Sequence, residues 1–156
     1  LNNFLKWYQQ LSAESLGKKG KGFLPIISTM PKDNHSLLQL YLDGPKNNFF
    51  SFFSSREKSS FKFNKNFLIN ELKHINKKNV DQLLQAQKKA TQNVFSKKKF
   101  SFRSFEIINR NEETLGELFT FFILETLMLS TLSNVNPINQ PSVELIKIET
   151  RNILGK

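Results

Sequence analysis

An α/β layered fold with a mostly parallel sheet is the fold class that this sequence predicts. Segments with helical periodicity alternate along the chain with short apolar segments, which is typical of layered α/β domains. The aromatic run at residues 48–53 is dense enough for a strand buried on both faces, as in a parallel sheet. The 156 residues, 16 of them phenylalanine, suffice for a single domain with a core of its own.

The first expected element is a helix ending near Gly17, because Phe4, Tyr8 and Leu11 recur at steps of three and four residues. Residues 22–28, bounded by glycine and proline, predict a strand near a sheet edge. The other expected elements are a helix through 37–41 capped by Asp33 or Asn34, strands at 48–53, 61–69 and 100–108, and helices at 80–94, from Asn111 through 129 and at 141–154. The helix after Asn111 is apolar on most sides, so we expect it to be largely buried or to form a subunit contact.

Composition narrows the classes of function. The absence of cysteine excludes disulfides and thiolate metal sites, and two separate histidines argue against a zinc or iron centre, so we expect no metal and no cofactor. The longest apolar run, residues 118–132, is interrupted by Glu125 and is expected to be too short and too mixed to cross a bilayer. With no signal-peptide pattern at the start, the sequence predicts a cytoplasmic protein without a membrane partner.

The net charge of +10 leaves a basic nucleic-acid-binding module as an alternative. The lysine runs at 18–21, 77–78 and 97–99 flank predicted element ends, where solvated lysines are ordinary. They are accompanied by no signature of an RNA- or DNA-binding motif. We therefore expect no nucleic-acid partner, and a positive field attracts smaller anions equally well.

Two pairs of polar residues stand at helical spacing. Gln10 and Glu14 lie one turn apart on the first helix and share a face. Glu14 falls in the last turn, where the negative end of the helix dipole favours proton uptake, as a general base requires. Gln140 and Lys147 are seven residues apart and project from one side of the last helix. On spacing alone, a solvated helix surface is the commoner explanation of both pairs.

His35 is the fifth candidate residue. We expect it in the first turn of the helix through 37–41, where the positive end of the dipole favours a neutral imidazole. Such a histidine exchanges protons near neutral pH. Without its flanking residues it would be an ordinary histidine at a helix start.

Three segments of the sequence resemble glucose-6-phosphate isomerases, in the order in which that family has them. They are WYQQLSAESLGKKGKG at 7–22, NHSLLQLYLDGP at 34–45 and NPINQPSVELIK at 136–147. The resemblance implies a three-layer α/β/α sandwich of the SIS type over residues 1–156, corresponding to the C-terminal portion of a longer isomerase. The family's N-terminal half, with its G-G-R-F/Y-S motif and its Ser/Thr-rich phosphate-binding loop, is absent from these residues.

The resemblance also implies an activity, the interconversion of glucose 6-phosphate and fructose 6-phosphate through a cis-enediol. Glu14 would be the catalytic base and Gln10 a substrate contact. His35 would assist ring opening in the active site of the neighbouring subunit of a homodimer. Gln140 would contact the substrate, and Lys147 would assist ring opening. The chain alone is expected to be inactive without the N-terminal half, and a non-catalytic sugar-phosphate-binding domain of the same type is the alternative.

Overall fold

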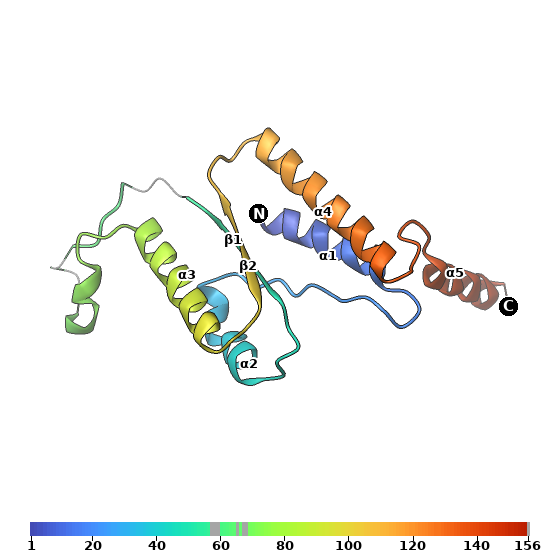
Figure 1. Ribbon diagram of the computed structural model, residues 1–156, viewed down its shortest axis with the longest axis horizontal. Helices are drawn as coiled ribbons and strands as arrows, with labels where there is room; N and C mark the ends of the chain where they lie inside the picture. The colour runs from blue at the N-terminus through green and yellow to red at the C-terminus, as the bar shows by residue number, and fades with distance from the viewer. Residues whose placement is uncertain (57–59, 65, 67–68, 156) are drawn as a thin grey trace. The chain divides into compact units, whose positions relative to one another are not determined.

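The computed structural model describes residues 1–56, 60–64, 66 and 69–155. The chain divides into two compact units, Leu1–Ile27 with Asn111–Lys156 and Ser28–Arg110. The elements in chain order are α1 (Asn2–Leu16), the 3-10 helix η1 (Lys32–His35), α2 (Leu38–Asp43), β1 (Phe50–Ser55), the 3-10 helix η3 (Asn70–Ile75), α3 (Val80–Lys97), β2 (Phe102–Ile107), α4 (Glu112–Leu132) and α5 (Pro141–Leu154) (Figure 1).

A β1–α3–β2 arrangement forms the centre of the unit Ser28–Arg110. β1 and β2 pair in parallel, with a register running from Phe50 opposite Phe102 to Ser55 opposite Ile107. Parallel neighbours need a crossover connection, and α3 provides it. The predicted α/β class with a parallel sheet is therefore confirmed, and the described part of the chain contains two strands of that sheet.

The side chain of Phe95 joins α3 to the sheet. It is 2% exposed, and its ring centroid lies 4.7 Å from that of Phe50 and 5.5 Å from that of Phe52. Alternate residues of a strand share a face, so α3 covers the face that carries Phe50 and Phe52. The strand itself is half-buried throughout, whereas the sequence predicted burial on both faces.

Two other predicted strands are not observed as such. Residues 22–28 form no strand; Leu24 and Ile26 are 64% and 72% exposed, and the carbonyl of Pro25 accepts a hydrogen bond from Gln9 Nε2 at 2.5 Å. A strand needs a neighbour to pair with, and these residues have none among those described. Of the strand predicted at 61–69, residues 65, 67 and 68 lie outside the described residues, and the described part shows a single antiparallel bridge between Lys62 and Asn79.

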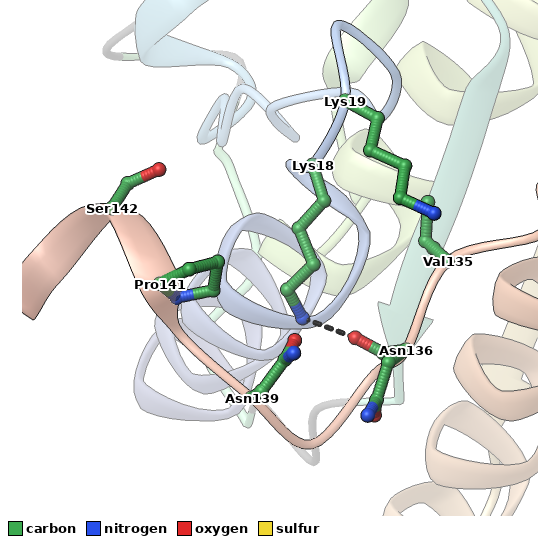
Figure 2. Close-up of a pocket in the computed structure, with 7 residues that line it drawn as sticks. All are labelled: Lys18, Lys19, Val135, Asn136, Asn139, Pro141 and Ser142. Atoms are coloured by element: carbon green, nitrogen blue, oxygen red, sulfur yellow. Dashed lines mark hydrogen bonds between the residues drawn. The ribbon is translucent and has the colours of Figure 1, made fainter.

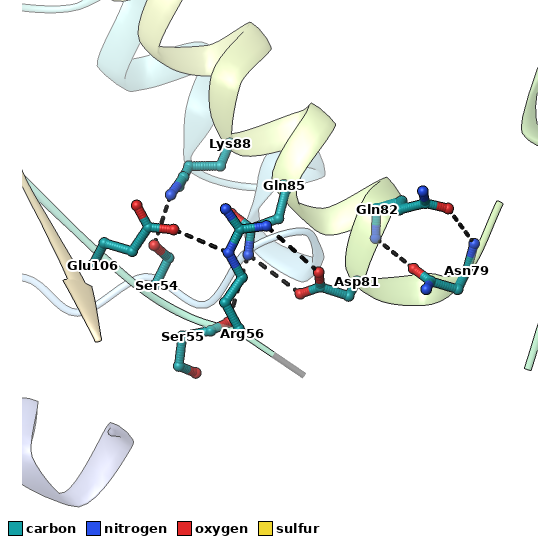
Figure 3. Close-up of polar contacts among 9 residues, drawn as sticks. All are labelled: Ser54, Ser55, Arg56, Asn79, Asp81, Gln82, Gln85, Lys88 and Glu106. Carbon is teal, nitrogen blue, oxygen red and sulfur yellow. Dashed lines mark hydrogen bonds and ion pairs between the residues drawn. The ribbon is translucent and has the colours of Figure 1, made fainter. Parts of the chain in front are cut away.

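Polar contacts fix the start of α3 (Figure 3). Asn79 Oδ1 accepts from the backbone N–H of Gln82 at 2.8 Å, and Gln82 Oε1 accepts from the backbone N–H of Asn79 at 3.0 Å. This capping box satisfies two backbone donors that the first helical turn leaves unpaired. Beside it, the Arg56 guanidinium donates to Glu106 at 3.1 Å, joining the residue after β1 to β2.

The cap predicts a measurable loss of stability. We expect Asn79→Ala to lower the free energy of unfolding by about 1 kcal/mol, because a donor at the helix start loses its partner. Urea denaturation followed by circular dichroism measures the change. Asn93→Ala is the matched control, since Asn93 is exposed within the same helix and alanine is the better helix former there. Equal losses in both variants would contradict the assigned cap.

A second prediction concerns the end of α2. Asp43 accepts from Lys98 Nζ at 2.7 Å and from Gln39 Nε2 at 2.8 Å. The hydrogen bond and the charge of Lys98, followed by the Gln39 bond, lower the Asp43 pKa below 3.8. The contact therefore stabilises the fold above about pH 3.8, and its contribution disappears as the pH falls through the lowered pKa.

An acid titration of the Asp43 carboxyl signal by NMR checks this. We expect its midpoint below that of an unpaired aspartate and a return toward the ordinary value in Lys98→Met. Lys97→Met, which removes a neighbouring exposed ammonium, is expected to leave the midpoint in place. If the titration midpoint of Asp43 were the same in Lys98→Met and in the wild-type protein, the ion pair would not form in solution.

The other unit is centred on the packing of α1 against α4. Phe122 of α4 has no exposed surface, and its ring centroid lies 4.4 Å from that of Tyr8 and 5.6 Å from that of Phe4. Ser12 of α1 and Thr126 of α4 are also buried, and such small side chains let two helices approach closely. The phenol of Tyr8 donates to Glu125 Oε2 at 3.2 Å, so the only charged residue in the middle of α4 has a partner.

The prediction that α4 is largely buried is wrong. Its buried residues are Phe122, Thr126 and Ser130, one stripe of the helix, whereas Met128 and Leu132 are 68% and 81% exposed. α1 is one helix and covers one stripe of its neighbour, so among the described residues the remaining apolar surface of α4 is largely uncovered. The alternative expectation, a subunit contact, stays a prediction.

Length and composition alone would allow α4 to cross a membrane. Among the described residues, this 21-residue helix is the one that is long and apolar enough to cross a membrane. The prediction that the apolar run is too short and too mixed to span a bilayer therefore does not hold. The test is weak support for a membrane span, because the core helix of a water-soluble protein passes it too.

Candidate functional site

Glu14 lies in the last turn of α1, as predicted. The helix ends at Leu16, and the backbone N–H of Gly17 closes it by donating to the carbonyl of Ala13 at 3.1 Å. Phe4 and Tyr8 turn one side of α1 toward α4, which leaves Glu14 on the exposed side. The packing of the helix thus fixes where this carboxylate points.

Both carboxylate oxygens of Glu14 accept a hydrogen bond from a glutamine amide. Gln10 Nε2 donates to Oε1 at 2.8 Å, from one turn earlier on the same helix. Gln140 Nε2 donates to Oε2 at 3.0 Å, from 126 residues further along the chain. Hydrogen bonds to a carboxylate are stronger than those between neutral groups, and two of them fix the plane of the carboxylate. The structure therefore brings together three of the five predicted site residues.

Gln140 is free to reach Glu14 because α5 does not use its side chain as a cap. It is the residue before α5, and Pro141 occupies the first helical position, as predicted. The Gln140 side chain makes no capping hydrogen bond, so its amide is available to the carboxylate. The start of α5 is in this way attached to the end of α1.

Lys147 lies two turns further along α5. Its ammonium pairs with Glu144 Oε1 at 2.5 Å, within the same helix, and both side chains are more than half exposed. Among the contacts of the described residues, none links Lys147 to Glu14, so the predicted grouping of these two residues is not seen as a direct contact. A flexible lysine in an exposed pair is free to exchange its partner for a ligand.

A hollow of about 190 Å³ lies beside the start of α5 (Figure 2). It is lined by Lys18, Lys19, Val135, Asn136, Asn139, Pro141 and Ser142. Within it, Lys18 Nζ donates to the carbonyl of Asn136 at 2.6 Å. Withdrawal from water lowers the pKa of Lys18. The walls of the hollow thus come from the segments that carry Glu14 and Gln140.

Comparison with known proteins shows which proteins this chain is similar to. The chain is 34% identical over 164 residues to the glucose-6-phosphate isomerase of Mycoplasmopsis synoviae, a match covering 100% of this chain and 37% of that protein. It is 33% identical to the Campylobacter jejuni enzyme of the same name, covering 97% and 39%, and 31% identical to that of Methanocaldococcus jannaschii, covering 92% and 35%. No family model matches the chain.

The chain is thus similar over nearly its whole length to proteins named glucose-6-phosphate isomerase. It spans between a third and two fifths of the length of these relatives. A solved structure, that of a hypothetical protein from Thermus thermophilus, superposes with a TM-score of 0.85 at 25% identity over 97% of this chain and 38% of that one. The predicted α/β fold is thus found in a solved structure, also as part of a longer chain.

His35, the histidine of the isomerase-like motif, is not where the sequence placed it. It is the last residue of the 3-10 helix η1, and α2 begins three residues later at Leu38. Neither Asp33 nor Asn34 caps α2, because the residue before the helix is Leu37, which makes no side-chain cap. Asp33 instead accepts from the backbone N–H of Thr29 at 2.6 Å. The argument that a helix N-terminus favours its neutral imidazole therefore falls away. His35 is exposed and belongs to the unit Ser28–Arg110, whereas Glu14 and Gln140 belong to the other.

Lys18 and Lys21 are residues whose contacts sequence reasoning missed. It took them for part of a solvated lysine run at a helix end, yet Lys18 binds the carbonyl of Asn136 and Lys21 that of Ser133. The available signal was their position just after a helix, where ammonium groups meet unpaired carbonyls. The neighbouring sequence does not indicate which distant carbonyls the two lysines bind.

Proposed function

We propose that this chain supplies part of the active site of an isomerase that interconverts glucose 6-phosphate and fructose 6-phosphate. The observation that carries the proposal is the carboxylate of Glu14, held at both oxygens by Gln10 and Gln140. A carboxylate fixed in this way is suited to a base that must reach two adjacent carbon atoms. The names of the relatives support the choice of substrate.

The chemistry needs a proton to move between C2 and C1 of the open-chain sugar. Glu14 removes the proton from C2 of the aldose, the C2–H electron pair forms the C1–C2 double bond, and the former carbonyl oxygen gains a proton to give the cis-enediol. The second hydroxyl of the enediol then loses its proton, and the carboxyl of Glu14 returns a proton to C1, which yields the ketose. A single base on one face of the sugar performs both transfers.

The other predicted residues have supporting roles in this proposal. Gln10 and Gln140 hold the carboxylate and contact the sugar. Lys147 assists ring opening and stabilises the developing negative charge. His35 assists ring opening from the second subunit of a homodimer.

The chain is proposed to act with the remainder that its relatives possess. We call the combination the isomerase-length protein. In this proposal the remainder binds the sugar phosphate, so the 156-residue chain alone has no isomerase activity. The protein is proposed to be cytoplasmic, where its substrates are.

Isomerisation in D₂O tests the proposal. We expect the isomerase-length protein to convert glucose 6-phosphate into fructose 6-phosphate carrying deuterium at C1, because the proton on Glu14 exchanges with solvent. Conversion without any deuterium would indicate a hydride shift and reject the base. Saturable binding of the sugar phosphate without conversion would favour the non-catalytic binding domain. Activity of the 156-residue chain alone would contradict the role given to the remainder.

A further inference from the structure

Two lysines that follow α1 bind backbone carbonyls of the segment that leads into α5. Lys18 Nζ donates to the carbonyl of Asn136 at 2.6 Å and to that of Ser15 at 3.0 Å. Lys21 Nζ donates to the carbonyl of Ser133 at 2.7 Å. The segment 133–140 is not helical, and it ends at Gln140, the residue that binds Glu14.

Both lysines sit where an ammonium group is favoured. Ser15 lies in the last turn of α1, and Ser133 is the residue that ends α4. The last carbonyls of a helix lack partners within the helix and carry the negative end of its dipole. Lys18 thus meets the end of α1, and Lys21 the end of α4. Their ammonium groups join the two helix ends next to the candidate site.

Hydrogen bonds within and next to the segment 133–140 fix its backbone, so the position of Asn136 influences that of Gln140. Val135 is 7% exposed, and its backbone N–H donates to the carbonyl of Ser130 at 3.0 Å. Asn136 Oδ1 accepts from the backbone N–H of Ile138 at 2.9 Å, which closes a turn. A lysine bound to the Asn136 carbonyl therefore acts on the base of this turn, four residues before Gln140.

We propose that Lys18 and Lys21 are positioning residues, a lysine clasp that holds the segment 133–140 so that Gln140 stays against Glu14. The catalytic consequence rests on the proposed function of Glu14 as the base. The clasp itself rests on the three lysine contacts alone.

Lys18→Met and Lys21→Met test the clasp, because methionine keeps much of the apolar stem and removes the ammonium. Lys6→Met is the control, since it removes the same charge from an exposed position on α1. Hydrogen–deuterium exchange of the isomerase-length protein, read by mass spectrometry, is the structural readout. We expect at least tenfold faster exchange in peptides covering 133–143 for each clasp variant, no change for Lys6→Met, and unchanged exchange within α1 and α4.

Kinetics separate positioning from substrate binding. A displaced Gln140 leaves the base poorly oriented, so we expect kcat to fall about tenfold with KM within twofold. Lys18→Arg, which keeps a cation at the site, is expected to restore part of the rate. A raised KM with unchanged kcat would show that the lysines bind substrate and would overturn the proposal, as would unchanged exchange at 133–143. If the wild-type protein has no isomerase activity, the proposed function fails, and the exchange data alone decide whether the clasp exists.

Discussion

We expect Glu14→Gln to lower the kcat of the isomerase-length protein by about a thousandfold, within the range for removing a general base. The substitution keeps the size of the side chain and removes its capacity to accept the C2 proton. The fold should persist, because the amide oxygen of the new glutamine still accepts one of the two hydrogen bonds that Glu14 now receives. A coupled assay of fructose 6-phosphate formation measures kcat, and loss of deuterium uptake from D₂O locates the defect in the proton transfer.

The matched control is Glu113→Gln. Glu113 is an exposed carboxylate in the first turn of α4, in the same unit as Glu14, so the change in net charge is identical. We expect its kcat to stay within twofold of the wild-type value. A Glu14→Gln enzyme that retained a tenth or more of the wild-type kcat would exclude Glu14 as the base.

Features governed by local chemistry were predictable from the sequence. The start of α4 is the clearest case: Asn111 was expected to cap it, and Asn111 Oδ1 accepts from the backbone N–H of Thr114 at 3.0 Å. The shared face of Gln10 and Glu14 follows from their spacing and is confirmed, since the two side chains are joined by a hydrogen bond of 2.8 Å. Both features involve residues less than two turns apart, so no knowledge of the remaining fold was needed.

Features that depend on distant partners were not predictable in this way. The apolar composition of α4 predicted burial, but burial requires neighbours, and α1 covers one stripe of the helix. Residues 22–28 have the composition of a strand and no strand beside them among the described residues. In both cases the apolar pattern indicates that a segment can pack against other elements. Whether a neighbouring helix or strand lies there depends on the tertiary structure.

The contact between Gln140 and Glu14 lies between these extremes. Spacing along the chain says nothing about two residues 126 positions apart. The resemblance to the isomerases placed both residues in one site, and the structure joins them. Neither the spacing nor the resemblance predicted that Lys18 and Lys21 bind distant carbonyls. No sequence pattern indicates the acceptor of a surface lysine.

The largest effect on stability is expected for Phe122→Ala, at about 4 kcal/mol lost from the free energy of unfolding. The Phe122 ring has no exposed surface and contacts the rings of Phe4 and Tyr8 between α1 and α4. Alanine would leave a cavity at the place where the two helices meet, and the surrounding side chains relax into such a cavity only in part. A loss of this size is a large fraction of the stability of an ordinary domain.

Urea denaturation followed by tryptophan fluorescence measures the loss. Trp7 is the single tryptophan of the chain, and its ring centroid lies 4.4 Å from that of Phe119 of α4, so its emission reports on the α1–α4 contact. Leu132→Ala serves as the control, because Leu132 is 81% exposed at the end of the same helix and should change stability by no more than about 0.5 kcal/mol. Since α1 carries Glu14, separation of the two helices should also weaken the contact between Glu14 and Gln140. A Phe122→Ala protein as stable as Leu132→Ala would mean that α1 and α4 are not held together through this ring.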